Sequence, residues 1–174
     1  MRNIAMLSAA LTRALTTPAF TAGDFTPTKW DSAKDKADFA NALLKFIAQD
    51  FPRTKFHNAM YNRLSSTFGH IAHCDRTGFY ETFFLTAKGK IAFLEQCVNW
   101  PCFGDPTYTY CDVERAVIGR LRTSNVLTLL QSQTTIEQRQ TDLALFAKLK
   151  ARHEPVATSS TPSPSLFSLL EGGQ

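Results

Sequence analysis

Two histidines and a cysteine lie close together in the segment GHIAHC, at positions 70, 73 and 74. Imidazole nitrogens and a thiolate are ligands that zinc accepts readily. If the segment is helical, His70 lies three residues before His73 and four before Cys74, so the three side chains can converge on one face. The sequence therefore offers His70, His73 and Cys74 as candidate zinc ligands, with the fourth position taken by another cysteine, by Asp75 or by water.

Two other interpretations of the same segment stay open. Histidines near the end of a helix can be structural, because a protonated imidazole interacts favourably with the helix dipole. Cys74 beside a histidine could also act as a thiol nucleophile. The sequence contains neither a nucleophile elbow nor a glycine-rich phosphate loop. It therefore favours a non-enzymatic protein over a hydrolytic zinc protein or a thiol enzyme.

A second group of candidate residues lies on a helix expected over residues 112–122. Its spacing places Arg115, Gly119 and Arg122 together, opposite an apolar arc. A glycine between two arginines lets a phosphate or a backbone come close, as on basic helices that bind nucleic acid. The alternative is an ordinary solvated face.

Arg120 differs from the other arginines of this helix because it falls on the apolar side. A cation in that position must extend to the surface or pair with an acid. We expect Asp50, which falls within the apolar arc of its own helix, to be such a partner.

The segment WPCFGDPTYTYCD, residues 100–112, is expected to be a structured loop because it contains two prolines and a glycine. Its rings include Trp100, Tyr108 and Tyr110, residue types that serve at interfaces and in stacking on bases. The alternative is a loop whose rings pack on each other. With Arg115 and Arg122, these three rings form the candidate nucleic-acid surface.

Composition indicates one globular domain. The chain has 174 residues and a net charge of +4, with 44% hydrophobic and 20% charged residues. This apolar content can build a core without disulfides or metal. The four cysteines are too few for a disulfide scaffold, and with no apolar run of about 18 residues we expect a cytoplasmic protein without a membrane partner.

Helical periodicity dominates the chain from Ser32 onward and predicts a mostly α fold. Ser32 and Asp35 form an expected capping box, and Phe51-Pro52 is expected to close the helix that follows. A second helix is expected over residues 54–72. Residues 79–100 could form two short helices, broken near Gly89, or a hairpin of aromatic strands, and their spacing favours helices.

The compact helical domain is predicted over residues 29–153, with different behaviour at the two ends. Residues 1–28 are predicted to be a flexible segment. The first 23 residues contain basic but no acidic side chains, which fits a targeting segment, an amphipathic extension or an extended start site. Residues 154–174 are predicted to be a disordered tail, whose apolar LFSLL motif could dock on a protein partner.

The motifs YNRLSSTFGHIAH and WPCFGDPTYTYCDVER together resemble uncharacterised proteins carried by bacterial plasmids and integrative mobile elements. The resemblance covers about residues 39–122. It implies a bacterial cytoplasmic setting without a defined activity, so it assigns a role to no residue. The leading prediction is an accessory protein that binds nucleic acid or a nucleic-acid-handling protein, and the alternatives are a zinc protein and a factor that docks through its tail.

Overall fold

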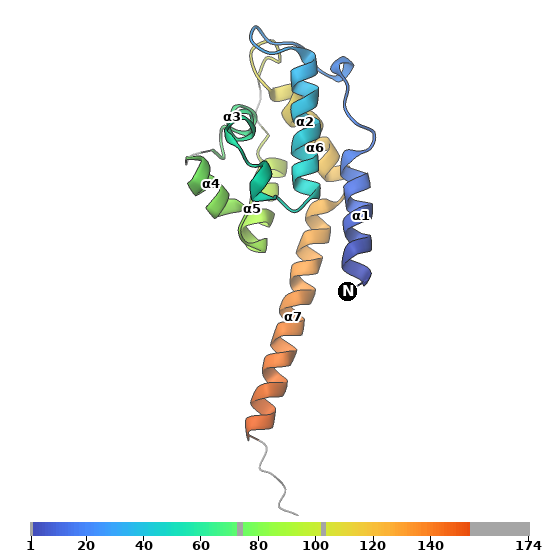
Figure 1. Ribbon diagram of the computed structural model, residues 1–174, viewed down its shortest axis with the longest axis vertical. Helices are drawn as coiled ribbons and strands as arrows, with labels where there is room; N and C mark the ends of the chain where they lie inside the picture. Colours follow the sequence, from blue (N-terminus) through green and yellow to red (C-terminus); the bar gives the residue numbers. More distant parts are fainter. Residues whose placement is uncertain (1, 73–74, 102–103, 154–174) are drawn as a thin grey trace, which may run out of the picture. The chain divides into compact units, whose positions relative to one another are not determined.

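The computed structural model describes residues 2–72, 75–101 and 104–153, with side chains described from residue 9 onward (Figure 1). The described residues form helices and connecting turns and contain no strand, which confirms the predicted mostly α fold. No described helix combines the length and the hydropathy needed to cross a membrane. The α-helices are α1 (Arg2–Thr16), α2 (Ala33–Ala48), α3 (Asn58–Thr67), α4 (Arg76–Phe83), α5 (Ala87–Asn99), α6 (Cys111–Thr123) and α7 (Val126–His153), and the short 3-10 helices are η1 (Ala22–Asp24) and η2 (Arg53–Lys55).

The chain divides into two units, residues 1–135 and residues 136–174. The first unit contains the hydrophobic core and all elements through the first turns of α7. In the second unit, the described residues 136–153 are helical and exposed throughout. The single domain predicted over residues 29–153 thus has its packed core in the first unit.

Helix α2 begins and ends where the sequence predicts. Ser32 and Asp35 form the expected capping box. At the other end, the amide of Asp50 donates to the carbonyl of Ile47 and the amide of Phe51 donates to that of Phe46, which is the Schellman arrangement of hydrogen bonds. The ring of Phe51 also contacts that of Phe46, with centroids 5.3 Å apart. This contact turns the chain back over the apolar face of α2 before Pro52.

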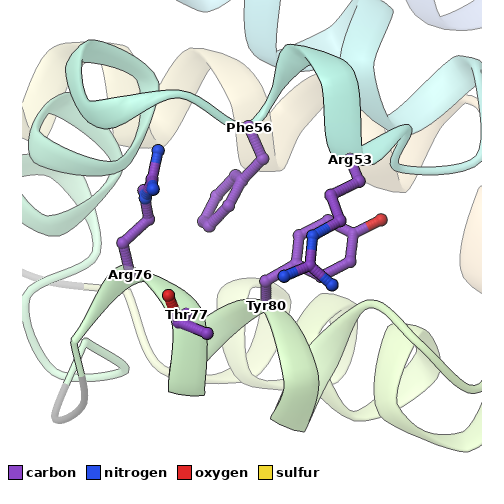
Figure 2. Close-up of a pocket in the computed structure, with 5 residues that line it drawn as sticks. All are labelled: Arg53, Phe56, Arg76, Thr77 and Tyr80. Atoms are coloured by element: carbon purple, nitrogen blue, oxygen red, sulfur yellow. The ribbon is translucent and has the colours of Figure 1, made fainter.

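Aromatic rings join α2 to α4 and α5. The rings of Phe51 and Phe84 stack with centroids 4.8 Å apart, and Phe84 meets Phe93 at 5.1 Å. Phe56 and Tyr80 lie at the edge of this cluster, where they line a shallow hollow (Figure 2). The aromatic residues of the segment 79–100 are thus packed by two helices, and the strand hairpin is excluded.

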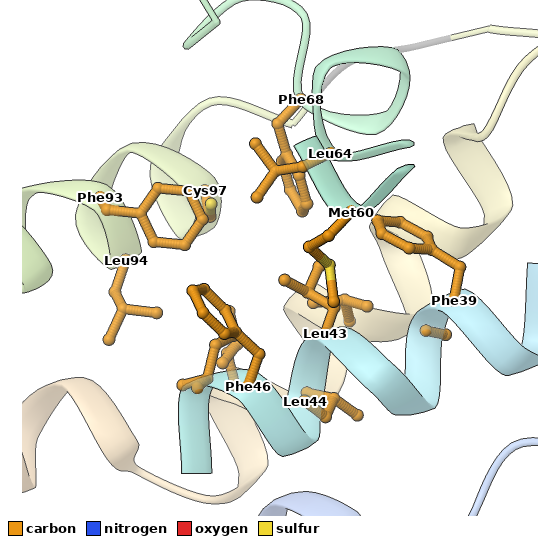
Figure 3. Packing of buried hydrophobic residues seen from close by; sticks show 14 of the residues in the cluster. Phe39, Leu43, Leu44, Phe46, Met60, Leu64, Phe68, Phe93, Leu94 and Cys97 are labelled. Atoms are coloured by element: carbon orange, nitrogen blue, oxygen red, sulfur yellow. The ribbon is translucent and has the colours of Figure 1, made fainter. Parts of the chain in front are cut away.

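Aliphatic side chains from α2, α3 and α5 complete the core of the first unit (Figure 3). Leu43 of α2, Leu64 of α3 and Leu94 of α5 are all fully buried or nearly so. Each such side chain removed from water contributes about 1.5–3 kcal/mol. The apolar arc predicted for α2 is therefore the face that holds the first unit together.

The N-terminal segment packs on this core, which the sequence did not predict. Helix α1 lies beside α2 (Figure 1), and Leu15 is fully buried. Arg120 donates to the carbonyls of Leu15 at 3.1 Å and Pro18 at 2.8 Å. Its guanidinium also lies over the ring of Phe20, 4.8 Å from the centroid. This packing places the start of the domain, predicted at residue 29, nearer the N-terminus.

The expected pair of Arg120 with Asp50 does not form. Asp50 instead binds Lys90, with Oδ1 and Nζ 2.7 Å apart. Asp50 has a φ of 64°, so it occupies the left-handed position that closes the Schellman motif. Its carboxylate therefore faces α5, and the N-terminal carbonyls satisfy Arg120.

Lys36 is the most deeply buried charged residue of α2, with a side chain that is fully inaccessible to solvent. Its Nζ donates to the carbonyls of Pro106 at 2.8 Å and Thr109 at 2.9 Å. It also binds the carboxylate of Asp112, at 3.0 Å from Oδ1. Because an ammonium has three donors, these partners satisfy it fully.

Gly89 lies inside the first turn of α5, not in a break between helices. The break falls before Thr86, whose hydroxyl caps α5 by accepting from the amide of Gly89 at 3.0 Å. A Cβ at Gly89 would lie 2.6 Å from the carbonyl oxygen of Thr82 and 2.9 Å from that of Phe83. Glycine is needed here because α4 and α5 approach each other closely.

We expect Lys36→Met to lower the free energy of unfolding by about 3–5 kcal/mol, because it leaves the largely buried carboxylate of Asp112 without its cation. The matched control is Lys34→Met on the same helix. Lys34 pairs with Asp38, but both side chains are mostly exposed, so a change within about 1 kcal/mol is expected. Urea unfolding of both variants tests this, and equal losses would contradict the prediction.

We expect Gly89→Ala to lower the free energy of unfolding by about 1–3 kcal/mol, because the new methyl group would overlap two backbone oxygens. Gly119→Ala is the control, since nothing lies within 4 Å of a Cβ built at Gly119. Alanine in that exposed helix interior should raise stability by about 0.5–1 kcal/mol. Thermal unfolding should give opposite signs for the two variants, and a stabilised Gly89→Ala would refute the close approach.

Candidate nucleic-acid interface

Helix α6 separates its side chains as the sequence predicts. Val113, Val117 and Leu121 are buried in the core. Arg115, Gly119 and Arg122 are all exposed. Acidic residues occupy the first turn of this helix and basic residues the last, which favours the helix through its dipole. The face that carries the two arginines is thus firmly held and open to solvent.

Arg122 lies beside the end of α5. Its Nη2 donates to the carbonyl of Val98 at 2.7 Å. Trp100 follows two residues later as the C-cap residue of α5, and 69% of it is exposed. The structure therefore places Arg122 of α6 against the end of α5, the helix that the exposed Trp100 caps.

Arg115 lies beside the other end of the same loop. Its Nη2 donates to the sulfur of Cys111 at 3.4 Å, and this thiol donates to the carbonyl of Gly104 at 2.9 Å. Tyr108, in the turn that follows Asp105, is 65% exposed. The loop thus carries two exposed rings, Trp100 and Tyr108, and each arginine bonds to a group at one end of it.

Tyr110 does not belong to this exposed surface. Only 6% of it is accessible, and its ring meets that of Phe39 with centroids 6.1 Å apart. Arg63 donates to its hydroxyl. Burial, together with a hydrogen bond to Asp31, raises the pKa of Tyr110 well above its ordinary value, while Arg63 opposes the rise. The assignment of Tyr110 to stacking on nucleic-acid bases is therefore corrected, because this ring is buried against Phe39 of α2.

The candidate zinc ligands are not aligned by a continuous helix. Helix α3 ends at Thr67, and His70 lies in the turn that follows. The ring of His70 packs edge-on against Phe68, with centroids 6.4 Å apart. His73 and Cys74 lie outside the described residues. The helix expected over residues 54–72 thus ends before His70, and zinc binding by these three residues stays a prediction.

No group of three or more histidine, cysteine or acidic side chains is placed to hold a metal ion within the described part of the chain. Cys97, one of the cysteines considered as a further ligand, is buried beside the core. Burial raises the pKa of the Cys97 thiol well above its ordinary value, and the charge of Glu114 adds to the rise. A thiol in this state is poorly suited to act as a thiolate ligand or nucleophile.

The hollow in Figure 2 is a second basic site, which was not predicted from the sequence. It has a volume of about 240 Å³ and is lined by Arg53, Phe56, Arg76, Thr77 and Tyr80. Arg53 lies over the ring of Tyr80, 5.3 Å from the centroid. The hydroxyl of Tyr80 donates to the carbonyl of Phe51 at 2.8 Å. The two arginines could attract an anion. Sequence reasoning missed this site because Arg53 and Arg76 are far apart in the chain and only tertiary packing brings them to one hollow.

Comparisons of the chain with protein-family models, with curated proteins and with solved structures found no match. The tail motif LFSLL, expected from the sequence to dock on a protein partner, lies outside the described residues.

Tyr110→Ala should lower the free energy of unfolding by about 3–5 kcal/mol, because it removes a buried ring from the core. Tyr108→Ala, two residues earlier in the same loop, should change it by less than about 0.5 kcal/mol because Tyr108 is mostly exposed. Urea unfolding of the two variants distinguishes the structural tyrosine from the surface tyrosine. Similar values would contradict this assignment.

Proposed function

We propose that the protein binds single-stranded nucleic acid through the exposed face of α6 and the loop beside it. Arg115 and Arg122 would contact phosphates, and Trp100 would stack on a base. The observation that carries the proposal is the hydrogen bond from Arg122 to the carbonyl of Val98. It holds a guanidinium at the end of α5, the helix that the exposed Trp100 caps, and a cation with an exposed ring is the combination that single strands require.

The chemistry of the arginines supports this proposal. A guanidinium has five N–H donors, so Arg122 keeps donors for a phosphate after bonding to Val98. Gly119 lies between the two arginines with open space above it, which lets a sugar-phosphate backbone approach the helix. Buried free Cys97 and Cys111 are compatible with a reducing cytoplasm.

The choice of a single strand over a duplex follows from the exposed rings. Trp100 and Tyr108 can stack only on bases that are not already stacked within a helix. The net charge of +4 is modest, so binding should depend on a few contacts and fall steeply with salt. A duplex would offer phosphates to the arginines but no base to the rings.

Fluorescence anisotropy with a labelled single-stranded oligonucleotide over a series of salt concentrations tests the proposal. Arg115→Gln with Arg122→Gln should reduce the salt slope by about 1.4, since each lost phosphate contact on a single strand contributes about 0.7. Trp100→Ala should weaken binding by about 1–3 kcal/mol through the lost stacking. A duplex competitor should compete poorly.

The matched control is Arg53→Gln with Arg76→Gln, which removes the same charge from the hollow of Figure 2. This control should leave the effect of Trp100→Ala intact and change affinity less than the α6 pair does. Equal losses from both pairs would show that only net charge matters. Absence of salt-dependent binding by the unsubstituted protein would refute the proposed function.

A further inference from the structure

The second unit carries an unusual density of exposed apolar side chains. Between residues 136 and 153 of α7, the exposed fractions are 57% for Ile136, 60% for Leu143, 55% for Leu145, 65% for Phe146 and 44% for Leu149. A helix that buries no apolar face gains little stability from packing. Contiguous apolar surface of this kind marks an interaction site.

Three of these side chains form one stripe. Leu143, Phe146 and Leu149 follow one another at intervals of three residues, so they cover neighbouring positions over two turns. Arg139 and Lys150 lie on the same side, one turn before Leu143 and one turn after Phe146. The stripe is thus short and bounded by cations, as at a contact between two helices.

The charges of this segment are divided between its two halves. Residues 136–144 contain the acids Glu137 and Asp142 and the base Arg139, whereas residues 145–153 contain Lys148, Lys150 and Arg152 and no acid. Two such helices side by side in parallel would place the basic halves together. Asp142 and Lys150 are the opposite charges on the same side as the stripe, four residues before and four residues after Phe146. An antiparallel pair centred on Phe146 places Lys150 of each helix near Asp142 of the other, and it also opposes the helix dipoles.

We propose that residues 136–153 pair with the same segment of a second copy of this chain as antiparallel helices. The stripes of the two copies interleave at the centre of the contact, and Asp142 of each helix faces Lys150 of the other. This inference does not depend on the proposed function. A lipid surface is less suitable because Arg139 and Lys150 flank the short stripe on its apolar side.

Analytical ultracentrifugation of the full chain over a wide range of concentrations tests the pairing. The unsubstituted protein should sediment as a dimer that dissociates on dilution. Leu143→Ser with Phe146→Ser should be monomeric at concentrations where the unsubstituted protein is dimeric. Leu145→Ser is the matched control, because Leu145 has a similar exposure but lies about 100° or more around the helix from both Phe146 and Leu143, and it should stay dimeric.

Charge reversal tests the antiparallel orientation. Lys150→Glu should weaken the dimer at least tenfold, because two carboxylates then face each other. Adding Asp142→Lys in the same chain should restore it. Circular dichroism should show the same helix content in all variants, since these side chains are exposed.

Three results would overturn the inference. One is a protein that is monomeric at all concentrations. Another is a dimer that is unaffected by Leu143→Ser with Phe146→Ser, or that Leu145→Ser disrupts to the same extent. The third is a monomer that co-sediments with anionic phospholipid vesicles and loses this binding in Leu143→Ser with Phe146→Ser, which would assign the stripe to a lipid surface.

Discussion

The buried ammonium of Lys36 organises the first unit more than any other polar group. Moving a charge out of water costs several kcal/mol unless its partners satisfy it. The partners of Lys36 come from the loop before α6, through the carbonyls of Pro106 and Thr109, and from α6 itself, through Asp112. The conformation of this loop and the position of α6 on α2 are therefore constrained together, and with them the exposed face that carries the arginines.

The same carboxylate ties the N-terminal segment to α6. Asp112 accepts from the amide of Thr26 at 2.9 Å through Oδ2, and Arg120, two turns further along α6, binds the carbonyls of Leu15 and Pro18. Helix α6 is thus fixed along its inner side by the core and by the N-terminal segment. Its remaining side is fixed in place without being covered, which is what a preorganised binding face requires.

Local sequence signals predicted most of the helices. The features that they did not predict depend on contacts between residues far apart in the chain. The capping box at Ser32 and the apolar arc of α6 depend on neighbours in the sequence, so both were predictable. Lys36 could also have been recognised, since it precedes Phe39 and Leu43 by three and seven residues and so falls on the buried arc of α2. The end of α3 at Thr67 was harder to predict from the sequence. It depends on a long-range contact, because the next residue, Phe68, is buried against Phe93 of α5.

The two tyrosines of the loop illustrate the limit of residue type as a guide to function. Tyr108 and Tyr110 are two residues apart, yet one is exposed and the other lies between Lys36 and Arg63. The environment of Tyr110 depends on cations from α2 and α3, which the loop sequence does not contain. Pairing through residues 136–153 would also strengthen binding to a single strand, because two copies of the arginine face in one molecule raise the effective concentration of the second site. A modestly charged surface could then hold a long single strand that neither copy would retain alone.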